Sequence, residues 1–243
     1  MSKKGILYGV GVGPGDPELL TVKAVKVLEK ADVVAYFSKE GNKSNARKIV
    51  EPYIRPGMIE LPLPYPLTIE ENVKSDVYQE AIGGFFEQAA GDVARYLDEG
   101  KSVAVLSAGD PFLFGSYMHL HIRLCAHYEA EVIPGITAMS GCWALANTPI
   151  AQGDDVLSIM TGILSEEALT RHLRNVQAAV IMKVGRNLPK IRRALEAAGK
   201  LNDAVYVERG TMSNNKVIPL KELEGDNFPY FSLILVPGWK AKP

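Results

Sequence analysis

The sequence predicts an α/β protein of two α/β domains, the first with a mostly parallel sheet and the second with a mixed sheet. Short β-branched runs alternate with helical stretches through most of the 243 residues, which is typical of parallel strands covered by helices. Near the C-terminus two predicted strands follow one another without a helix between them, so the second sheet should contain antiparallel neighbours.

The first half of the chain contains five apolar runs with the length and composition of β-strands. These predicted strands span 6–12, 33–37, 58–61, 102–106 and 130–133. The stretches between them have helical spacing, and the predicted helices span 17–30, 43–51, 70–99 and 112–127. The segment 60–66 reads ELPLPYP, and its prolines predict an extended loop on the surface.

The second half continues the alternation and then changes it. Helices are predicted over 136–147, 165–174 and 187–198, and strands over 156–161, 179–183, 204–207, 216–219 and 231–236. We expect the boundary between the two domains after residue 120, which gives domains 1–120 and 121–243 of similar size.

The composition excludes several classes of partner. A net charge of −1 provides no basic field for nucleic acid, and no run of about 18 apolar residues is present to span a membrane. The two cysteines, Cys125 and Cys142, are too few for a disulfide framework and suit a reducing compartment. The apolar N-terminal run is broken by glycines and stops at Pro14, so we expect no signal peptide and a cytoplasmic protein.

A glycine-rich loop, GVGVGPGD, follows the first predicted strand over residues 9–16. No window in it has the spacing G-x-G-x-x-G of a dinucleotide fingerprint, and it lacks the Gly-Lys-Ser/Thr of a P-loop. Asp16 and Glu18 instead occupy the start of the next helix, where a bound phosphate would lie. The loop therefore either approaches a ligand without phosphate or makes a structural turn.

Two more loops rich in small residues follow apolar strands. They read LSAGDPFLFG over 106–115 and VIPGITAMSG over 132–141. Ligands of open α/β sheets bind beyond the carboxyl ends of the strands, where all three loops should lie. Each loop alone is a weak signal, but together they predict a binding site.

These stretches resemble the S-adenosylmethionine-dependent tetrapyrrole methylases, also called class III methylases. The resemblance rests on GVGPGDPELLTVKA, LSAGDPFLFGS, VIPGITAMSG and VERGTM, and it covers essentially the whole chain. Within the family, IMKVGRNLPKIRRAL and YVERGTM are most similar to the members that methylate C20 of precorrin-2 in cobalamin biosynthesis.

The resemblance implies a cofactor cleft between two α/β domains, with a tetrapyrrole trough in the first domain and the cofactor site completed by the second. It also implies a homodimer, S-adenosylmethionine as methyl donor, S-adenosylhomocysteine as product and a small-molecule tetrapyrrole as substrate. The family's cofactor residues correspond to Pro14, Ala108, Gly109, Asp110, Leu113, Thr137, Ala138, Val184 and Gly210. Asp110 would face the cationic end of the cofactor, cap the helix that Pro111 begins, or do both.

Because the methyl of a sulfonium is already activated, transfer depends on alignment and exclusion of water more than on a strong base. Some relatives carry an aspartate after the second strand, where this chain reads AYFSK, so the proton acceptor is unassigned and Tyr36 is a weak candidate. A substrate with eight carboxylates should meet a basic rim. The weak candidates for that rim are Lys39, Lys43, Arg47, Arg55, Lys183, Arg186 and Arg209.

The histidines do not predict a metal site. His119 and His121 are two residues apart on a predicted helix and point about 200° apart, so they cannot share a metal without other ligands. His127, His172 and the two cysteines have no ligand spacing either. We therefore expect no metal.

Three alternatives remain at this point. The cobalt-containing substrate of the anaerobic route, cobalt-factor II, would leave the fold and cofactor unchanged. A diphthine-type methylation of a protein side chain would require an open or acidic groove in place of a basic rim. A tetrapyrrole carrier without transfer activity would not need the three loops, and calorimetry with S-adenosylmethionine would separate it from an enzyme.

Overall fold

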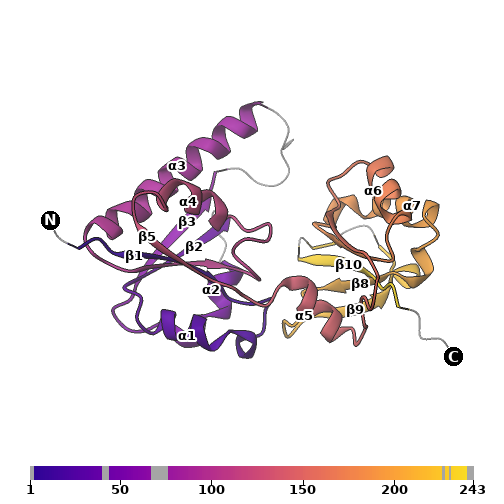
Figure 1. Ribbon diagram of the computed structural model, residues 1–243, viewed down its shortest axis with the longest axis horizontal. Coiled ribbons are helices and arrows are strands. Elements are labelled where there is room, and N and C mark those ends of the chain that lie inside the picture. The colour runs from indigo at the N-terminus through magenta and orange to yellow at the C-terminus, as the bar shows by residue number, and fades with distance from the viewer. Residues whose placement is uncertain (1–2, 40–43, 67–75, 226–227, 230, 240–243) are drawn as a thin grey trace. The chain divides into compact units, whose positions relative to one another are not determined.

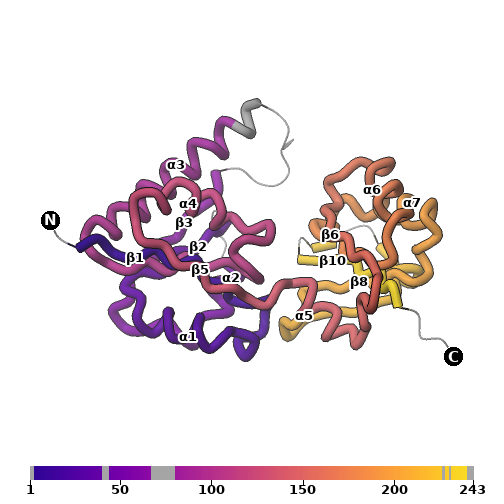
Figure 2. Tube along the Cα trace, viewed as in Figure 1, coloured from indigo at the N-terminus to yellow at the C-terminus, as the bar shows by residue number. Residues whose placement is uncertain are grey.

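A computed structural model of the chain describes residues 3–39, 44–66, 76–225, 228–229 and 231–239. It divides into two compact units, Met1–Thr137 and Ala138–Pro243. Each unit has one five-stranded sheet with helices packed on it (Figure 1), so the predicted pair of α/β domains is confirmed. Figure 2 traces the passage of the chain from the first unit into the second, where β5 leads into α5.

In the first unit the strand order is β3-β2-β4-β1-β5, and every neighbouring pair is parallel. The strands are β1 (Ile6–Gly11), β2 (Val33–Lys39), β3 (Ile59–Tyr65), β4 (Val103–Ser107) and β5 (Glu129–Ile133). The helices are α1 (Val22–Leu28), α2 (Asn45–Ile49), α3 (Asp76–Asp98) and α4 (Tyr117–Leu124), with 3-10 turns at Pro17–Leu19 and Glu51–Tyr53.

Both faces of this sheet are buried, as a parallel sheet requires. Side chains of α3 and α4, including Val93 and Leu120, pack with Leu7 on one face. Side chains of α1 and α2, including Leu28 and Ile49, pack on the other face. Figure 1 shows α3 and α1 on opposite sides of the strands.

The predicted domain boundary after residue 120 is wrong in position, because the structure divides after Thr137. Residue 120 lies inside α4, and the following strand, β5, returns to the first sheet to pair with β1. The chain can leave the first unit only after this last strand has been added.

The prediction of a surface loop over 60–66 is also wrong, since most of it forms β3. This strand lies at the edge of the sheet, and among the described strands its partner is β2. Pro62 and Pro64 are two residues apart, so the positions that lack an N–H donor lie on the same side of the strand. An edge strand tolerates this, because it needs N–H donors only on the side that faces its partner strand.

In the second unit the strand order is β6-β7-β10-β8-β9. β6 and β7 are parallel, whereas β10 is antiparallel to both β7 and β8, and β8 is antiparallel to β9, which confirms the predicted mixed sheet. The strands are β6 (Leu157–Thr161), β7 (Ala178–Met182), β8 (Val205–Glu208), β9 (Lys216–Pro219) and β10 (Ser232–Val236).

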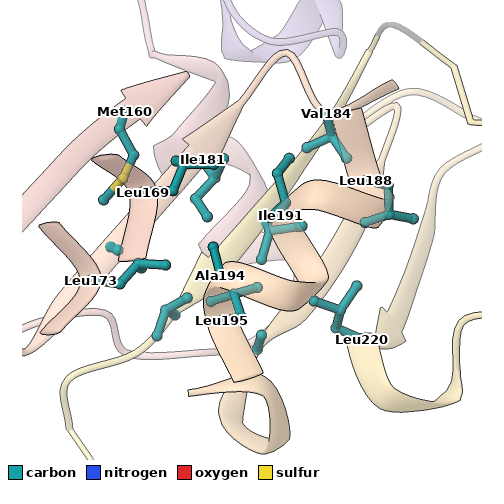
Figure 3. Close-up of a cluster of buried hydrophobic side chains, with 14 of the residues drawn as sticks. Met160, Leu169, Leu173, Ile181, Val184, Leu188, Ile191, Ala194, Leu195 and Leu220 are labelled. Atoms are coloured by element: carbon teal, nitrogen blue, oxygen red, sulfur yellow. The ribbon is translucent and has the colours of Figure 1, made fainter. Parts of the chain in front are cut away.

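Three helices cover this second sheet: α5 (Ala138–Leu145), α6 (Glu166–Arg174) and α7 (Leu188–Ala197). Short 3-10 turns lie at Gly185–Asn187, Leu201–Asp203 and Leu220–Glu222. Helical spacing places Leu188, Ile191 and Leu195 of α7 on one face, and all three are buried against α6 and the sheet (Figure 3). Cys142 of α5 is buried on the opposite face of the sheet.

Candidate functional site

The three loops singled out from the sequence follow β4, β1 and β5, which are neighbours in the sheet with β1 in the middle. Because the strands are parallel, the loops emerge together at the carboxyl edge. Backbone hydrogen bonds join the first two loops: Val12 N donates to Ser107 O at 2.9 Å, and Gly109 N donates to Gly13 O at 2.8 Å.

Three glycines allow these loops to touch backbone to backbone. A Cβ on Gly135 would lie 2.1 Å from the carbonyl oxygen of Gly109 and 2.8 Å from Cα of Gly11. A Cβ on Gly11 would lie 2.5 Å from the nitrogen of Gly135. No side chain fits at these distances, so glycine is required for the loops to converge. Gly11 and Gly135 were not among the site residues chosen from the sequence, although both stand in the quoted motifs.

Asp110 ties two of the loops together. Its Oδ1 accepts the N–H of Phe112 at 2.9 Å, and its Oδ2 accepts the N–H of Gly135 at 3.1 Å. Both carboxylate oxygens therefore hold backbone. The predicted helix cap at Asp110 is wrong, because residues 111–116 form turns and α4 begins only at Tyr117. Asp110 instead closes the turn at Phe112 and links it to the loop after β5.

The first loop ends in a turn that differs from the single predicted helix over 17–30. Asp16 Oδ1 accepts the N–H of Glu18 at 2.9 Å, so Asp16 is an N-cap, but the turn it starts is 3-10 and ends at Leu19. The α-helix begins again at Val22 under a separate cap from Thr21. Asp16 and Glu18 place two carboxylates at the start of the 3-10 turn, which leaves it unsuited to binding a phosphate.

The other predicted cofactor residues of the first unit differ in exposure. Ala108 is exposed, Leu113 and Thr137 are half-buried, and Pro14 and Gly109 are buried. Around Ala108, therefore, the loop presents small side chains and backbone at the surface of the carboxyl edge. Pro14 acts through packing within its loop.

In the second unit, Val184 and Gly210 lie in packed surroundings. The Val184 side chain is fully buried in the core beside Leu188 (Figure 3), so it lines the interior of this unit. A Cβ on Gly210 would lie 2.2 Å from Sγ of Cys142, which makes glycine necessary for packing against α5. Burial raises the pKa of the Cys142 thiol to about 12, so this cysteine stays protonated. Ala138 is half-buried at the first position of α5.

The basic residues predicted to rim the substrate fall into two groups. Arg47 is engaged within the first unit: Nε donates to Glu60 at 2.6 Å, Nη2 donates to the same carboxylate at 2.9 Å, and Nη1 pairs with Glu51. Arg55 donates to the carbonyl of Ala31 at 2.6 Å. These contacts favour structural roles for both arginines.

The remaining cations lie at the carboxyl ends of strands. Lys39 is exposed as the last residue of β2, and Lys43 lies outside the described residues. In the second unit, Lys183 directly follows β7 and Arg209 directly follows β8, while Arg186 is exposed three residues beyond Lys183. Lys39, Lys183, Arg186 and Arg209 therefore stay predicted contacts of the substrate, and so does Lys43, which the structure does not describe.

Tyr36 does not have the surroundings of a general base. Its hydroxyl donates to Oε2 of Glu60 at 3.1 Å, and burial, together with the negative charge of Glu60, raises the phenol pKa above its ordinary value. Forming a phenolate beside this carboxylate is unfavourable. This geometry disfavours Tyr36 as the proton acceptor, and its catalytic role stays an untested prediction.

Within the described part of the chain, no three side chains of His, Cys, Asp or Glu gather as a ligand set. The ring of His119 stacks on Phe86 with centroids 4.0 Å apart, and burial together with Arg123 lowers its pKa. Nδ1 of His121 is 3.1 Å from the hydroxyl of Tyr117. Both histidines are therefore occupied by local contacts.

Residues 6–224 match the family of tetrapyrrole (corrin/porphyrin) methylases. The chain belongs to this family. A precorrin-2 C(20)-methyltransferase from Sinorhizobium is 59% identical to this tetrapyrrole methylase, with 98% of each chain covered. A cobalt-precorrin-2 C(20)-methyltransferase from Salmonella typhimurium is 28% identical, with 96% of each covered. The match to the cobalamin biosynthesis protein CobIJ of Mycobacterium tuberculosis has 46% identity and spans 48% of that longer protein.

Solved structures show the same two-unit fold. Cobalt precorrin-4 methyltransferase CbiF aligns with a TM-score of 0.73 at 24% identity, covering 96% of this methylase and 94% of that chain. A uroporphyrin-III C-methyltransferase from Thermus thermophilus, solved with S-adenosylhomocysteine, aligns with a TM-score of 0.65 at 22% identity, covering 96% and 92%. The family resemblance found in the sequence is confirmed. Among the residues that the structure describes, no helix is long and apolar enough to cross a bilayer.

Proposed function

We propose that this methylase transfers the methyl group of S-adenosylmethionine to C20 of precorrin-2, a step of cobalamin biosynthesis, and releases S-adenosylhomocysteine. The observation that carries the proposal is the 59% identity to the Sinorhizobium enzyme over nearly the full length of both chains. The converging loops of the first unit support it, because they offer a cofactor the backbone approach that small residues permit.

The chemistry of the loops fits S-adenosylmethionine. The cofactor carries a carboxylate, a sulfonium and an adenosine but no phosphate, and the loops contain no lysine and have acids at the first helical turn. The exposed turn at Ala108 and the backbone at Thr137 would hold the methionine part, while Leu113 offers apolar contact. When bound, the cofactor supplies an activated methyl on its sulfonium.

The role of the protein in transfer is then to align and to exclude water. In-line attack by an electron-rich carbon on a methyl sulfonium requires reacting atoms held about 3–3.5 Å apart, which rigid loops favour. The link from Asp110 to Gly135 and the contact of three glycines provide that rigidity. Loss of the C20 proton after transfer needs only a modest base, and the residue that accepts this proton is unassigned.

We further propose a cytoplasmic homodimer. Two free cysteines, one exposed and one buried, suit a reducing compartment. Light scattering coupled to size-exclusion chromatography measures the oligomeric state directly: about twice the 26.5 kDa chain mass is expected, and the mass of a single chain would contradict the dimer.

The experiment for the reaction is a paired incubation with methyl-labelled S-adenosylmethionine under anaerobic conditions. One tube contains precorrin-2 and the other cobalt-factor II, and NMR locates the label in the product. Label at C20 of precorrin-2 is expected. Transfer only to the cobalt compound would move the enzyme to the route of the Salmonella relative, and transfer to neither would overturn the proposed substrate.

A further inference from the structure

Three residues other than glycine adopt left-handed backbone at the carboxyl edge of the second sheet. They are Lys183 after β7 (φ 55°), Arg209 after β8 (φ 48°) and Thr211 two residues later (φ 65°). Such conformations are unfavourable for residues with a side chain and persist where the surrounding structure imposes them, most often at ligand sites. Glycine would adopt these turns without strain, so the presence of lysine and arginine here indicates a role for their side chains.

The sheet brings the two basic residues to the same edge. Met182 of β7 pairs with Leu233 of β10, and Glu208 of β8 pairs with Ser232, so Lys183 and Arg209 leave the sheet on either side of the first residues of β10. Two strand spacings separate β7 from β8, which places the two turns about 10 Å apart. Long side chains from both turns can reach one group between them.

Hydrogen bonds fix both turns. The carbonyl of Lys183 accepts Nδ2 of Asn187 at 3.1 Å. The N–H of Arg209 donates to the carbonyl of Phe231 at 2.8 Å, and its own carbonyl accepts the N–H of Met212 at 3.0 Å. The strained backbone is thus held by its neighbours at both positions.

A buried carboxylate orients the arginine. Glu208 is 6% exposed and lies at the end of β8, where its Oε1 pairs with Nη1 of Arg209 and its Oε2 accepts the hydroxyl of Tyr206 at 3.1 Å. Burial raises the pKa of Tyr206 to about 12, so this hydroxyl remains a donor to the carboxylate. Glu208 was not selected from the sequence, although a glutamate ending the apolar strand VYVE is a signal of this kind.

Resting on the proposed function, we infer that Lys183 and Arg209 together bind one carboxylate side chain of the tetrapyrrole, and that Glu208 is a positioning residue for Arg209. Glu208 holds one nitrogen of the Arg209 guanidinium and so fixes the plane of the group. The other N–H donors of a guanidinium have the geometry to bind a carboxylate. Lys183 is half-buried at the other turn and contributes a second cation, whose charge suits a carboxylate. The class of ligand is an acetate or propionate group of a polycarboxylated macrocycle.

Asparagine is the informative replacement, because it removes the charge and tolerates left-handed backbone. Lys183→Asn, Arg209→Asn and Glu208→Gln are compared with Lys221→Asn, which removes an exposed lysine from the turn at Leu220–Glu222. Three quantities are measured: KM and kcat for precorrin-2, the Kd of uroporphyrin III, a stable macrocycle with eight carboxylates, and the Kd of S-adenosylmethionine by calorimetry.

Lys183→Asn and Arg209→Asn are each expected to raise KM for precorrin-2 and Kd for uroporphyrin III about tenfold, the effect of losing one charged hydrogen bond. Glu208→Gln should raise KM less, and Arg209→Lys should recover part of the loss by restoring the charge. The Kd of S-adenosylmethionine should stay within about twofold, which also shows that the variants are folded. Lys221→Asn should change none of these values.

Unchanged uroporphyrin binding in both Lys183→Asn and Arg209→Asn would overturn the inference. So would an equal loss of S-adenosylmethionine binding, because the pair would then serve the cofactor. If the unaltered protein binds uroporphyrin III through this pair yet does not methylate precorrin-2, the proposed function fails and the inference stands. If the unaltered protein binds neither macrocycle, both fail.

Discussion

Single atoms decide the geometry of the loops in the first unit. Gly11, Gly109 and Gly135 come from three separate stretches of sequence. A Cβ on Gly11 or on Gly135 would displace the backbone of the loops that they face, including the Gly109 carbonyl. Asp110 adds two directed hydrogen bonds to this contact. Sequence alone predicted that the loops would share one edge, but not which glycines would touch, because that depends on the distance between backbones from different loops.

At Gly135, replacement by alanine should separate the loops. The added methyl would lie 2.1 Å from the Gly109 carbonyl, so we expect a loss of about 1–3 kcal/mol of stability and weaker binding of S-adenosylmethionine. Urea unfolding and calorimetry measure the two effects. Gly91→Ala in α3, where a Cβ would meet nothing within 4 Å, is the matched control and should be neutral or stabilising.

Asp110→Asn tests the double role of the carboxylate. An amide has one acceptor oxygen, so the variant keeps either the bond from Phe112 N–H or the bond from Gly135 N–H. We expect stability to fall by about 0.5–1.5 kcal/mol, the range for loss of one hydrogen bond. Affinity for S-adenosylmethionine should fall as well, and a wild-type value for both would show that the link between loops is unimportant.

At the scale of elements, side-chain hydrogen bonds from α2 anchor the edge strand β3. Arg47 of α2 contacts Glu60 of β3 through two hydrogen bonds, and Glu60 also accepts the hydroxyl of Tyr36 from β2. The predicted roles of Arg47 in binding substrate and of Tyr36 in catalysis were drawn from position in the chain. The structure gives both residues a partner that the sequence does not reveal, since Glu60 lies in a segment whose prolines suggested a loop.

This network predicts a dependence of stability on pH. Hydrogen bonds from Arg47 lower the pKa of Glu60, so its contribution is complete above the ordinary glutamate pKa of about 4.3 and is lost as pH falls through the lower folded value. Glu60→Gln should therefore destabilise by about 0.5–1 kcal/mol at pH 7, the range of a partly exposed ion pair, and the difference should shrink toward pH 3.

Urea unfolding monitored from pH 3 to pH 7 checks this expectation. Glu29→Gln removes an exposed carboxylate at the end of α1 and is the control, for which we expect no change with pH beyond the wild-type trend. An equal effect of both substitutions at every pH would show that the Arg47 contact contributes nothing.

Most elements were predictable because their apolar periodicity matches their secondary structure, as in α7 and β10. The failures concern pairing between distant segments. The prolines of β3 suggested a loop, but an edge strand needs N–H donors on one side only. The helix before β5 looked like the end of the first domain, but β5 pairs with β1 and so belongs to the first sheet. No local pattern reports which strand a segment will join.

At the scale of the whole molecule, each unit has its own sheet and its own core. The buried residues of the first unit include Ile133 of β5, which packs with Val10 and Leu106. A domain cut at residue 120 would lose that strand and uncover one side of β1. The first unit is thus expected to be stable only when it extends to Thr137 and includes β5.

Two fragments of the first unit test that statement. Residues 1–137 should unfold cooperatively in urea, whereas residues 1–120, which lack β5, should be unfolded or lack a cooperative transition. Circular dichroism and tryptophan-independent probes such as tyrosine fluorescence measure both. Equal stability of the two fragments would contradict the role given to β5.

The place of β1 in the middle of its sheet also sets when the binding edge can form during synthesis. Its loop is translated first, but the glycines that it meets, Gly109 and Gly135, lie about 100 and about 120 residues further along the chain. At roughly 5–20 residues per second, the opening glycines wait on the order of 6–24 s on the ribosome before their partners exist. Until then the apolar residues of β1 are without β4 and β5, the two strands that bury them, so the nascent first unit exposes apolar surface that is prone to aggregation.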